Sequence, residues 1–474
     1  MVLSRPAGLS RALSLLVLAL ATSSLAGCKR HPPAPTPAEG AAALALPSSL
    51  ASAEEPGPEG DSAPAHCKQL PGFALTVDAA APTKSANPLP PGDDAGDQED
   101  DDTLLPFGVD IGAAVPTAAG FAVAGIRGAG MAFVALLDQH GGRRVDLGEL
   151  HGDAETPALA AAGDDVIVAL RSTDAAGFTL KLARLAATGS DAVQWGFELS
   201  KLGKTVTGVE LAVTGGRGVL VYQGEEKQGA SRLMLGTFSA ASLKEPFEVK
   251  PVAVKDAELP RLSPREGGYW LSWVHALPEP KSPGKKPKGA DAPADPEEAD
   301  LLEVGLRVVE VAKLDERGQL LGAALRIGEP RRQVLLYDVA PLASGGLLVA
   351  ARSDSAAPGA EGGALLLSEV GPDGSVHEER LEDDELGAGA PALFVDSAAK
   401  AAGPWLSMSS PSDATRLGLA RGGHSVLQAD RLLGRAEVIA VGAGHFLVQR
   451  ARGRDVSLEA LDCSWPKDGP APNQ

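Results

Sequence analysis

A short pattern recurs seven times along most of the chain: a glycine or turn, followed by an apolar run that reads as a β-strand. The first bulky residues of these runs are Phe121, Val166, Val219, Tyr269, Leu347, Trp405 and Phe446. Successive markers are separated by 45, 53, 50, 78, 58 and 41 residues. A period near 50 residues indicates an array of repeated structural units, each containing several strands.

Other strand-like segments lie beside the marker runs. Residues 334–339 and 436–441 precede a marker, residues 178–185 and 232–238 follow one, and residues 192–199 read as a fourth strand. Four of the third segments end in similar turns, which close on Gly141, Gly189, Gly318 and Gly374. Glycine suits a reversal that needs a positive φ. We therefore predict an all-β chain with three to four antiparallel strands in each unit.

The second strand of each unit is apolar on both faces, so its sheet must pack between two neighbours. This arrangement resembles a β-propeller of seven blades over residues 104–465. An open β-sandwich array is the alternative, because single-strand repeats are weaker evidence than complete blade motifs. The Ser-x-Asp-x-Gly-x-Thr-Trp box, the tryptophan-docking motif and the Trp-Asp dipeptide of known propeller families are missing from the sequence.

The amino terminus has the features of a secretory signal. Arg5 and Arg11 precede a short apolar run over residues 12–21, which is followed by the tetrapeptide at 25–28, Leu-Ala-Gly-Cys. This tetrapeptide resembles the lipobox of bacterial lipoproteins. The resemblance implies removal of residues 1–27, acylation of Cys28 and anchoring in a lipid bilayer. An ordinary signal peptide with an incidental cysteine is the alternative.

The residue after the lipobox bears on location, because an aspartate there is the best-known signal that retains such lipoproteins in the inner membrane. Lys29 occupies this position, so the resemblance favours the outer membrane of the cell envelope, with a periplasmic or surface-facing body.

Polar segments divide the chain into parts. Residues 28–66 form a Pro/Ala-rich tether, residues 79–103 an acidic linker and residues 466–474 a C-terminal tail. Residues 277–300 are a Pro/Lys-rich insertion, interpreted as a surface loop, with a partner-docking loop as the alternative. The acidic linker does not have the spacing of a calcium-binding loop.

The three cysteines suggest how the repeat array ends. Lipidation would consume Cys28 and leave Cys67 and Cys463, an even pair in an oxidising compartment. Residues 67–78 contain a strand-like segment, and the last repeat has three strands without an obvious fourth. We therefore expect residues 67–78 to close the ring and to bring Cys67 and Cys463 into a disulfide. Two unpaired thiols are the alternative.

Motifs for catalysis, cofactors and metals are missing from the sequence. It contains no CxxC, HExxH or GxSxG, and the segment at 203–205, Gly-Lys-Thr, lacks the glycine of a phosphate loop at position 198. A formal net charge of −19 argues against nucleic acid as a partner. The five tryptophans are expected in the core or between neighbouring units, with a sugar-stacking platform as the alternative. We predict no catalytic, cofactor-binding or metal-binding residues.

Two functions remain after these exclusions. The first is a monomeric, non-catalytic binding or scaffold lipoprotein whose partner is an envelope protein or polymer, and which turns over no generic hydrolase substrate. The alternative is an envelope polysaccharide hydrolase or lyase, with acidic residues from different blades converging at the propeller mouth.

Overall fold

The described part of the chain begins at residue 66. This computed structural model describes residues 66–79, 108–128, 130–151, 155–174, 177–203, 205–225, 231–254, 256–277, 307–328, 332–355, 364–381, 390–395, 404–409, 415–419 and 436–464. The predicted signal peptide, Cys28, most of the tether, the acidic linker beyond residue 79, the insertion beyond residue 277 and the C-terminal tail lie outside these residues. Within the described ranges, no helix has the length and hydropathy needed to cross a membrane.

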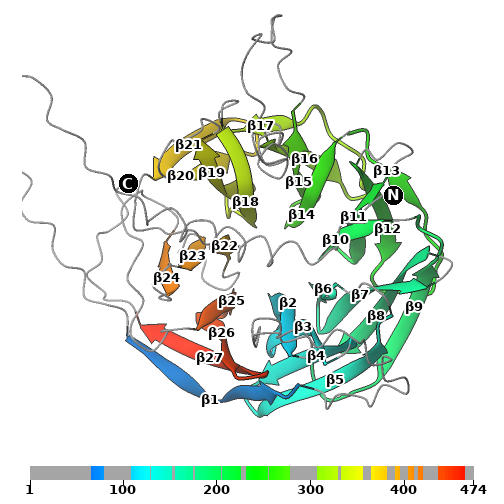
Figure 1. Ribbon diagram of the computed structural model, residues 1–474, viewed down its shortest axis with the longest axis vertical. Helices are drawn as coiled ribbons and strands as arrows, with labels where there is room; N and C mark the ends of the chain where they lie inside the picture. Colours follow the sequence, from blue (N-terminus) through cyan, green and yellow to red (C-terminus); the bar gives the residue numbers. More distant parts are fainter. Residues whose placement is uncertain are drawn as a thin grey trace, which may run out of the picture.

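The described strands form seven antiparallel sheets arranged around a common centre (Figure 1). The first three sheets each contain four strands that are consecutive in the chain. The first sheet consists of β2 (Val109–Pro116), β3 (Gly120–Arg127), β4 (Met131–Asp138) and β5 (Gly141–Glu149). The second consists of β6 (Ala158–Ala162), β7 (Asp165–Asp174), β8 (Gly177–Ala186) and β9 (Val193–Leu199). The third consists of β10 (Val206–Thr214), β11 (Arg217–Glu225), β12 (Ser231–Ser239) and β13 (Val249–Pro251).

The next three sheets follow the same order from the centre outward. The fourth consists of β14 (Ala257–Arg265), β15 (Gly268–Ala276), β16 (Arg307–Asp315) and β17 (Leu325–Ile327). The fifth consists of β18 (Arg332–Pro341), β19 (Leu347–Ser355), β20 (Ala364–Val370) and β21 (Val376–Leu381). The sixth consists of β22 (Pro391–Phe394), β23 (Trp405–Ser409) and β24 (Thr415–Leu419).

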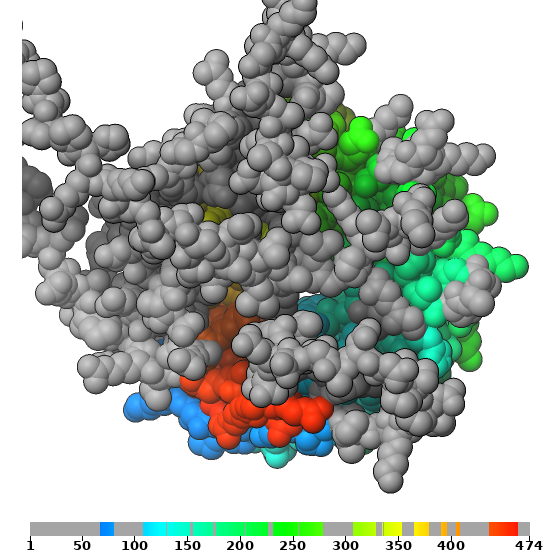
Figure 2. Space-filling model, viewed as in Figure 1, coloured from blue at the N-terminus to red at the C-terminus, as the bar shows by residue number. Residues whose placement is uncertain are grey.

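The seventh sheet joins the two ends of the described chain. Its order is β25 (Glu437–Gly442), β26 (His445–Arg452), β27 (Asp455–Ser464) and β1 (His66–Val77). Cys67 pairs with Cys463 and Val77 pairs with Val456 in the register of β1 and β27. Figure 2 shows the surfaces of β1, in blue, and of the red C-terminal strands side by side at the rim of the molecule. The strand expected at residues 67–78 therefore lies at the outer edge of the last sheet.

Apolar clusters fill the spaces between neighbouring sheets. Seven clusters of buried residues each combine side chains from two adjacent sheets, including the last and the first. In β7, Val166 and Val168 belong to the cluster shared with the first sheet, whereas Ile167 and Ala169 belong to the cluster shared with the third. Both faces of the second strand are therefore buried, as its continuous apolar sequence predicts.

The sequence patterns that predicted the strands correspond to regular positions in the sheets. Each of the seven marker residues lies on the second strand from the centre of its sheet. The four turn glycines, Gly141, Gly189, Gly318 and Gly374, all have φ between 72° and 139°. The prediction of an all-β repeat with these turns is confirmed.

Candidate functional site: a charged cluster on the inner strands

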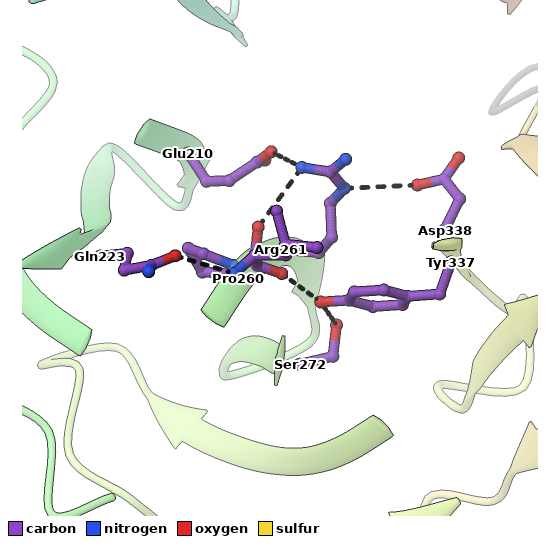
Figure 3. A network of polar contacts seen from close by, with 8 residues as sticks. Glu210, Gln223, Pro260, Arg261, Ser272, Tyr337 and Asp338 are labelled. Atoms are coloured by element: carbon purple, nitrogen blue, oxygen red, sulfur yellow. Dashed lines mark hydrogen bonds and ion pairs between the residues drawn. The ribbon is translucent and has the colours of Figure 1, made fainter. Parts of the chain in front are cut away.

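Three charged residues occupy equivalent positions on the innermost strands of consecutive sheets. They are Glu210 on β10, Arg261 on β14 and Asp338 on β18. Each lies four residues before the residue that closes the hairpin to the second strand, namely Thr214, Arg265 and Leu342. Equivalent register on adjacent sheets directs the three side chains toward one another (Figure 3).

The same position is apolar in the first and second sheets, where counting back four pairs from the hairpin closures on β2 and β6 leads to Ala113 and Ala158. On β25 the register leads to Glu437, which is exposed and bonded to Gln449. The charged side chains that contact one another therefore lie over the third, fourth and fifth sheets. A structural repeat alone would not require this difference, which marks the position as a candidate functional site.

Arg261 lies between the two carboxylates. Its Nη1 donates a hydrogen bond to Oε1 of Glu210 at 2.6 Å, and its Nε is 3.9 Å from Oδ1 of Asp338 (Figure 3). The other oxygen of Asp338 accepts a hydrogen bond from the backbone nitrogen of Leu393 on β22 at 2.8 Å. The cluster therefore connects four consecutive inner strands.

The side chains of the cluster remain partly accessible to solvent. The exposed fractions are 36% for Arg261, 25% for Glu210 and 27% for Asp338. A ligand that reached the inner wall could thus contact all three groups. The surrounding sheets nevertheless exclude most of the bulk water, and this shifts their protonation equilibria.

Burial has opposite consequences for the acids and for the arginine. It raises the pKa of Asp338, an effect that the positive charge of Arg261 opposes. Burial also raises the pKa of Glu210, again against the effect of Arg261, and the charge of Asp338 raises it further. For Arg261, burial alone would lower the pKa, but the charges of Glu210 and Asp338 outweigh it and the pKa is raised. The arginine stays charged, while the two acids hold their protons more tightly than exposed carboxyl groups do.

An unusual backbone conformation lies two residues before Arg261. Leu259 has a φ of 51°, in the left-handed region that a branched side chain rarely adopts. Its nitrogen donates to Oε1 of Gln223 at 3.3 Å, and its carbonyl oxygen accepts from the hydroxyl of Tyr337 at 2.6 Å. The hydroxyl of Ser272 lies 3.4 Å from that of Tyr337. Side chains from both neighbouring sheets therefore hold the backbone that carries Arg261.

A β-bulge accompanies this conformation. The register of β14 shifts by one residue between Glu258 and Arg261, and that of β10 shifts between Thr207 and Glu210. Bulges re-aim the side chains that follow them. Glu210 and Arg261 each end such a bulge, which accounts for their direction toward the inner wall.

The cysteines predicted from the sequence lie away from this cluster. Cys67 is 4% exposed on β1 and is directly opposite Cys463 on β27. Opposed residues of an antiparallel pair have Cα atoms about 4.5–5.5 Å apart, within the range that a disulfide needs. The backbone therefore permits the bond, which stays a prediction, and Cys28 lies outside the described residues.

The four described tryptophans divide into two groups, and Trp465 lies outside the described residues. Trp270 and Trp273 are buried, and Trp405 packs edge-on against Phe446 with ring centroids 5.1 Å apart, as a core role predicts. The expectation is wrong for Trp195, which is 36% exposed on β9 with the ammonium group of Lys181 over its ring. β9 is the outer strand of its sheet, and most of its residues are only partly buried or exposed.

Sequence reasoning missed the charged cluster. Glu210, Arg261 and Asp338 precede the markers of their repeats by eight or nine residues, and this regularity could have been noticed. The same spacing also selects Glu437, which is exposed and bonded to Gln449, so spacing alone does not define the cluster. Within the described ranges, no group of three or more His, Cys, Asp or Glu residues could hold a metal ion.

Comparison with known proteins supports the fold. No protein-family model matches the chain, and no curated protein matches it. The crystal structure of polysaccharide lyase Uly1 is similar, with a TM-score of 0.50, 11% identity and coverage of 84% of this chain and 99% of that one.

Weaker similarities extend to two further solved structures. YCF48 bound to D1 peptide has a TM-score of 0.43 at 11% identity, covering 88% of this chain and 99% of that one. An α-L-arabinanase of Penicillium chrysogenum complexed with arabinobiose has a TM-score of 0.38 at 12% identity, covering 63% and 90%. At these identities similarity concerns the fold alone, and together with the arrangement of the sheets the likeness to Uly1 shows that the chain has a β-propeller fold.

Proposed function

We propose that this protein is a lipid-anchored envelope protein whose β-propeller acts on a polysaccharide at the Glu210–Arg261–Asp338 cluster. The observation that carries the proposal is that two carboxyl groups, from separate sheets, lie on either side of the same arginine on a partly exposed inner wall. Cleavage of a glycosidic bond needs a proton donor for the departing oxygen. A carboxyl group with a raised pKa can hold that proton closer to neutral pH.

The two acids are suited to different roles. Glu210 accepts a short hydrogen bond from Arg261, which stabilises its ionised form. Asp338 accepts a hydrogen bond from the backbone nitrogen of Leu393, but its contact with that arginine is longer, at 3.9 Å, so Arg261 stabilises its negative charge less than that of Glu210. We assign the proton donor to Asp338 and the ionised partner to Glu210. Raised pKa values at a cluster of this kind are typical of acid–base sites.

A screen of purified protein against a panel of polysaccharides tests this assignment, with new chain ends as the readout. Asp338→Asn should lower turnover by about 10²-fold or more. Asp373→Asn is the matched control, because Asp373 is an exposed acid in the outer turn between β20 and β21. Failure to cleave any glycan, or full activity of Asp338→Asn, would refute the catalytic assignment.

A non-catalytic binding module is the second candidate. The close Glu210–Arg261 ion pair favours it, because such pairs also fix the geometry of inner strands without taking part in chemistry. If the propeller is a binding module, the protein binds a glycan or an envelope partner without turnover. Binding that survives in Asp338→Asn, with no cleavage by either form, would select this candidate.

The location in the envelope is part of the same proposal. It rests on the lipobox-like residues that end at Cys28. Mass spectrometry of the membrane fraction should find a mature chain that begins at an acylated Cys28, and Cys28→Ser should block maturation or release the protein. A soluble, unmodified chain that begins at another residue would contradict the anchoring.

We also propose that the seven sheets form a closed seven-bladed ring with β1 as the closing strand. Support comes from the pairing of β1 with β27 and from the apolar cluster shared by the last and first sheets. Closure of this kind removes a long unpaired strand edge. Deletion of β1 should therefore lower stability and promote aggregation, measured by thermal unfolding and light scattering.

A further inference from the structure

We infer that the cluster selects neutral or amino-substituted glycans and cleaves them by hydrolysis, not by elimination beside an acidic sugar. The inference rests on the proposed function and deepens it by naming the substrate class. Its basis is the charge of the three groups: the ionised Glu210 already balances the positive charge of Arg261, and Asp338 adds a negative charge whenever it loses its proton.

Two of the three nitrogens of the Arg261 guanidinium already face carboxylates, so an anion bound to Nη2 would lie close to both of them. Its Nη1 is hydrogen-bonded to Glu210 at 2.6 Å, and its Nε faces Asp338 at 3.9 Å. A uronate or sulfate group would have to displace one of these carboxylates or lie beside both of them. Negative charges at such a short distance would repel the anionic group. A wall that excludes most of the bulk water screens this repulsion poorly.

Other arginines of the fourth sheet are also engaged. Arg307 forms an ion pair with Glu258, and Arg326 lies 3.5 Å from Glu310. Arg265 donates to the backbone oxygens of Tyr269 and Leu314. Arg307 and Arg326 are therefore paired with carboxylates, and Arg265 is held by backbone oxygens beside the hairpin that joins β14 to β15.

The charge of the cluster also distinguishes the two ways of cutting a glycan. Elimination removes a proton next to a sugar carboxylate and builds negative charge, which an uncompensated cation would have to stabilise. Hydrolysis instead builds positive charge on the sugar ring. The ionised Glu210 can stabilise the second kind of transition state, and the protonated Asp338 can supply the proton that it requires.

The hydrolytic step balances with the residues present. The carboxyl proton of Asp338 passes to the glycosidic oxygen as its bond to the anomeric carbon breaks. A water oxygen bonds to that carbon, and the proton released from the water passes to the carboxylate of Glu210. Solvent then returns the two acids to their starting states, so that one glycan and one water yield two shorter glycans.

A binding experiment with three probes tests the selectivity: glucosamine oligomers, neutral glucose oligomers and galacturonate oligomers of equal length. The wild-type protein should bind glucosamine and glucose oligomers at least about tenfold more tightly than galacturonate oligomers at low salt, with a smaller difference at high salt. The double variant Glu210→Gln/Asp338→Asn leaves Arg261 unpaired and should reverse this order.

The control is Glu198→Gln/Asp373→Asn, which removes the same charge from β9 and from an outer turn and should keep the wild-type order. Tightest wild-type binding of galacturonate, or products with the unsaturated end left by elimination, would overturn the inference but leave polysaccharide action intact. Binding of no glycan by the wild-type protein would instead overturn the proposed function together with the inference.

Discussion

Leu259 on β14 occupies the bulge position that Gly208 occupies on β10. Their φ values are 51° and 60°, so both backbones are left-handed. Glycine adopts this conformation freely, whereas a residue with a side chain loses about 1–2 kcal/mol there. Because Gln223 and Tyr337 bind the two peptide groups of Leu259, neighbouring sheets sustain the strained conformation from which Arg261 extends.

Removal of the Tyr337 hydroxyl should weaken this support. Tyr337→Phe loses the 2.6 Å hydrogen bond to the carbonyl of Leu259, and we expect a loss of about 1–2 kcal/mol in the free energy of unfolding. Denaturant unfolding measures the change. Tyr222→Phe is the control, because Tyr222 is also buried, at 1% exposed. Burial alone accounts for the rise in the pKa of its hydroxyl to about 12. Equal effects of the two substitutions would argue against a special role for Tyr337.

The bulge on β10 should require glycine. Gly208→Ala places a side chain on a left-handed backbone and brings its Cβ to 3.2 Å from Cδ of Pro260. We expect a destabilisation of about 1–2 kcal/mol. Gly108→Ala is the matched control, because its Cβ would meet only the backbone oxygen of Arg454 at 3.8 Å. A thermal midpoint unchanged by Gly208→Ala would show that the bulge tolerates other conformations.

The stability of the protein should depend on the protonation of Asp338. Burial raises the pKa of this group on folding, so the folded state binds the proton more tightly than the unfolded state. The resulting stabilisation is complete below the ordinary carboxyl pKa and is lost as pH rises through the raised value. Asp338→Asn should remove this part of the pH dependence in denaturant titrations between pH 4 and pH 8.

Comparison with Glu210→Gln separates the titration of Asp338 from the loss of a salt bridge. The second variant removes the 2.6 Å contact with Arg261 and should be destabilised at neutral pH as well. Identical pH profiles for wild type and Asp338→Asn would show that burial does not perturb Asp338.

The opposed cysteines, Cys67 and Cys463, should form a disulfide bond that links β1 to β27. Non-reducing peptide mapping is expected to yield a linked peptide that contains Cys67 and Cys463. In the chain-entropy model such a long-range link stabilises the fold by about 5 kcal/mol. Cys463→Ala should therefore lower the melting temperature as much as reduction does. Free alkylation of both thiols in the native, unreduced protein would exclude the bond.

Much of the fold could be predicted because it depends on local patterns. The apolar run at Val166 to Leu170 is buried on both faces wherever its sheet packs between two others, and the glycine at 189 permits a tight turn in any neighbourhood. Even the pairing of the two chain ends followed from a missing fourth strand and an even number of cysteines. In each case the evidence lay within one repeat or in a simple count.

The charged cluster depends on relationships between repeats, and only the tertiary structure decided it. By itself the sequence determined an all-β repeat, its strand order and a lipobox-like amino terminus. Glu210, Arg261 and Asp338 are far apart in the chain, and their proximity depends on equal register in three sheets, whose inner strands each contain a one-residue bulge. Their raised pKa values follow from the same packing, because burial and neighbouring charge exist only after the sheets assemble.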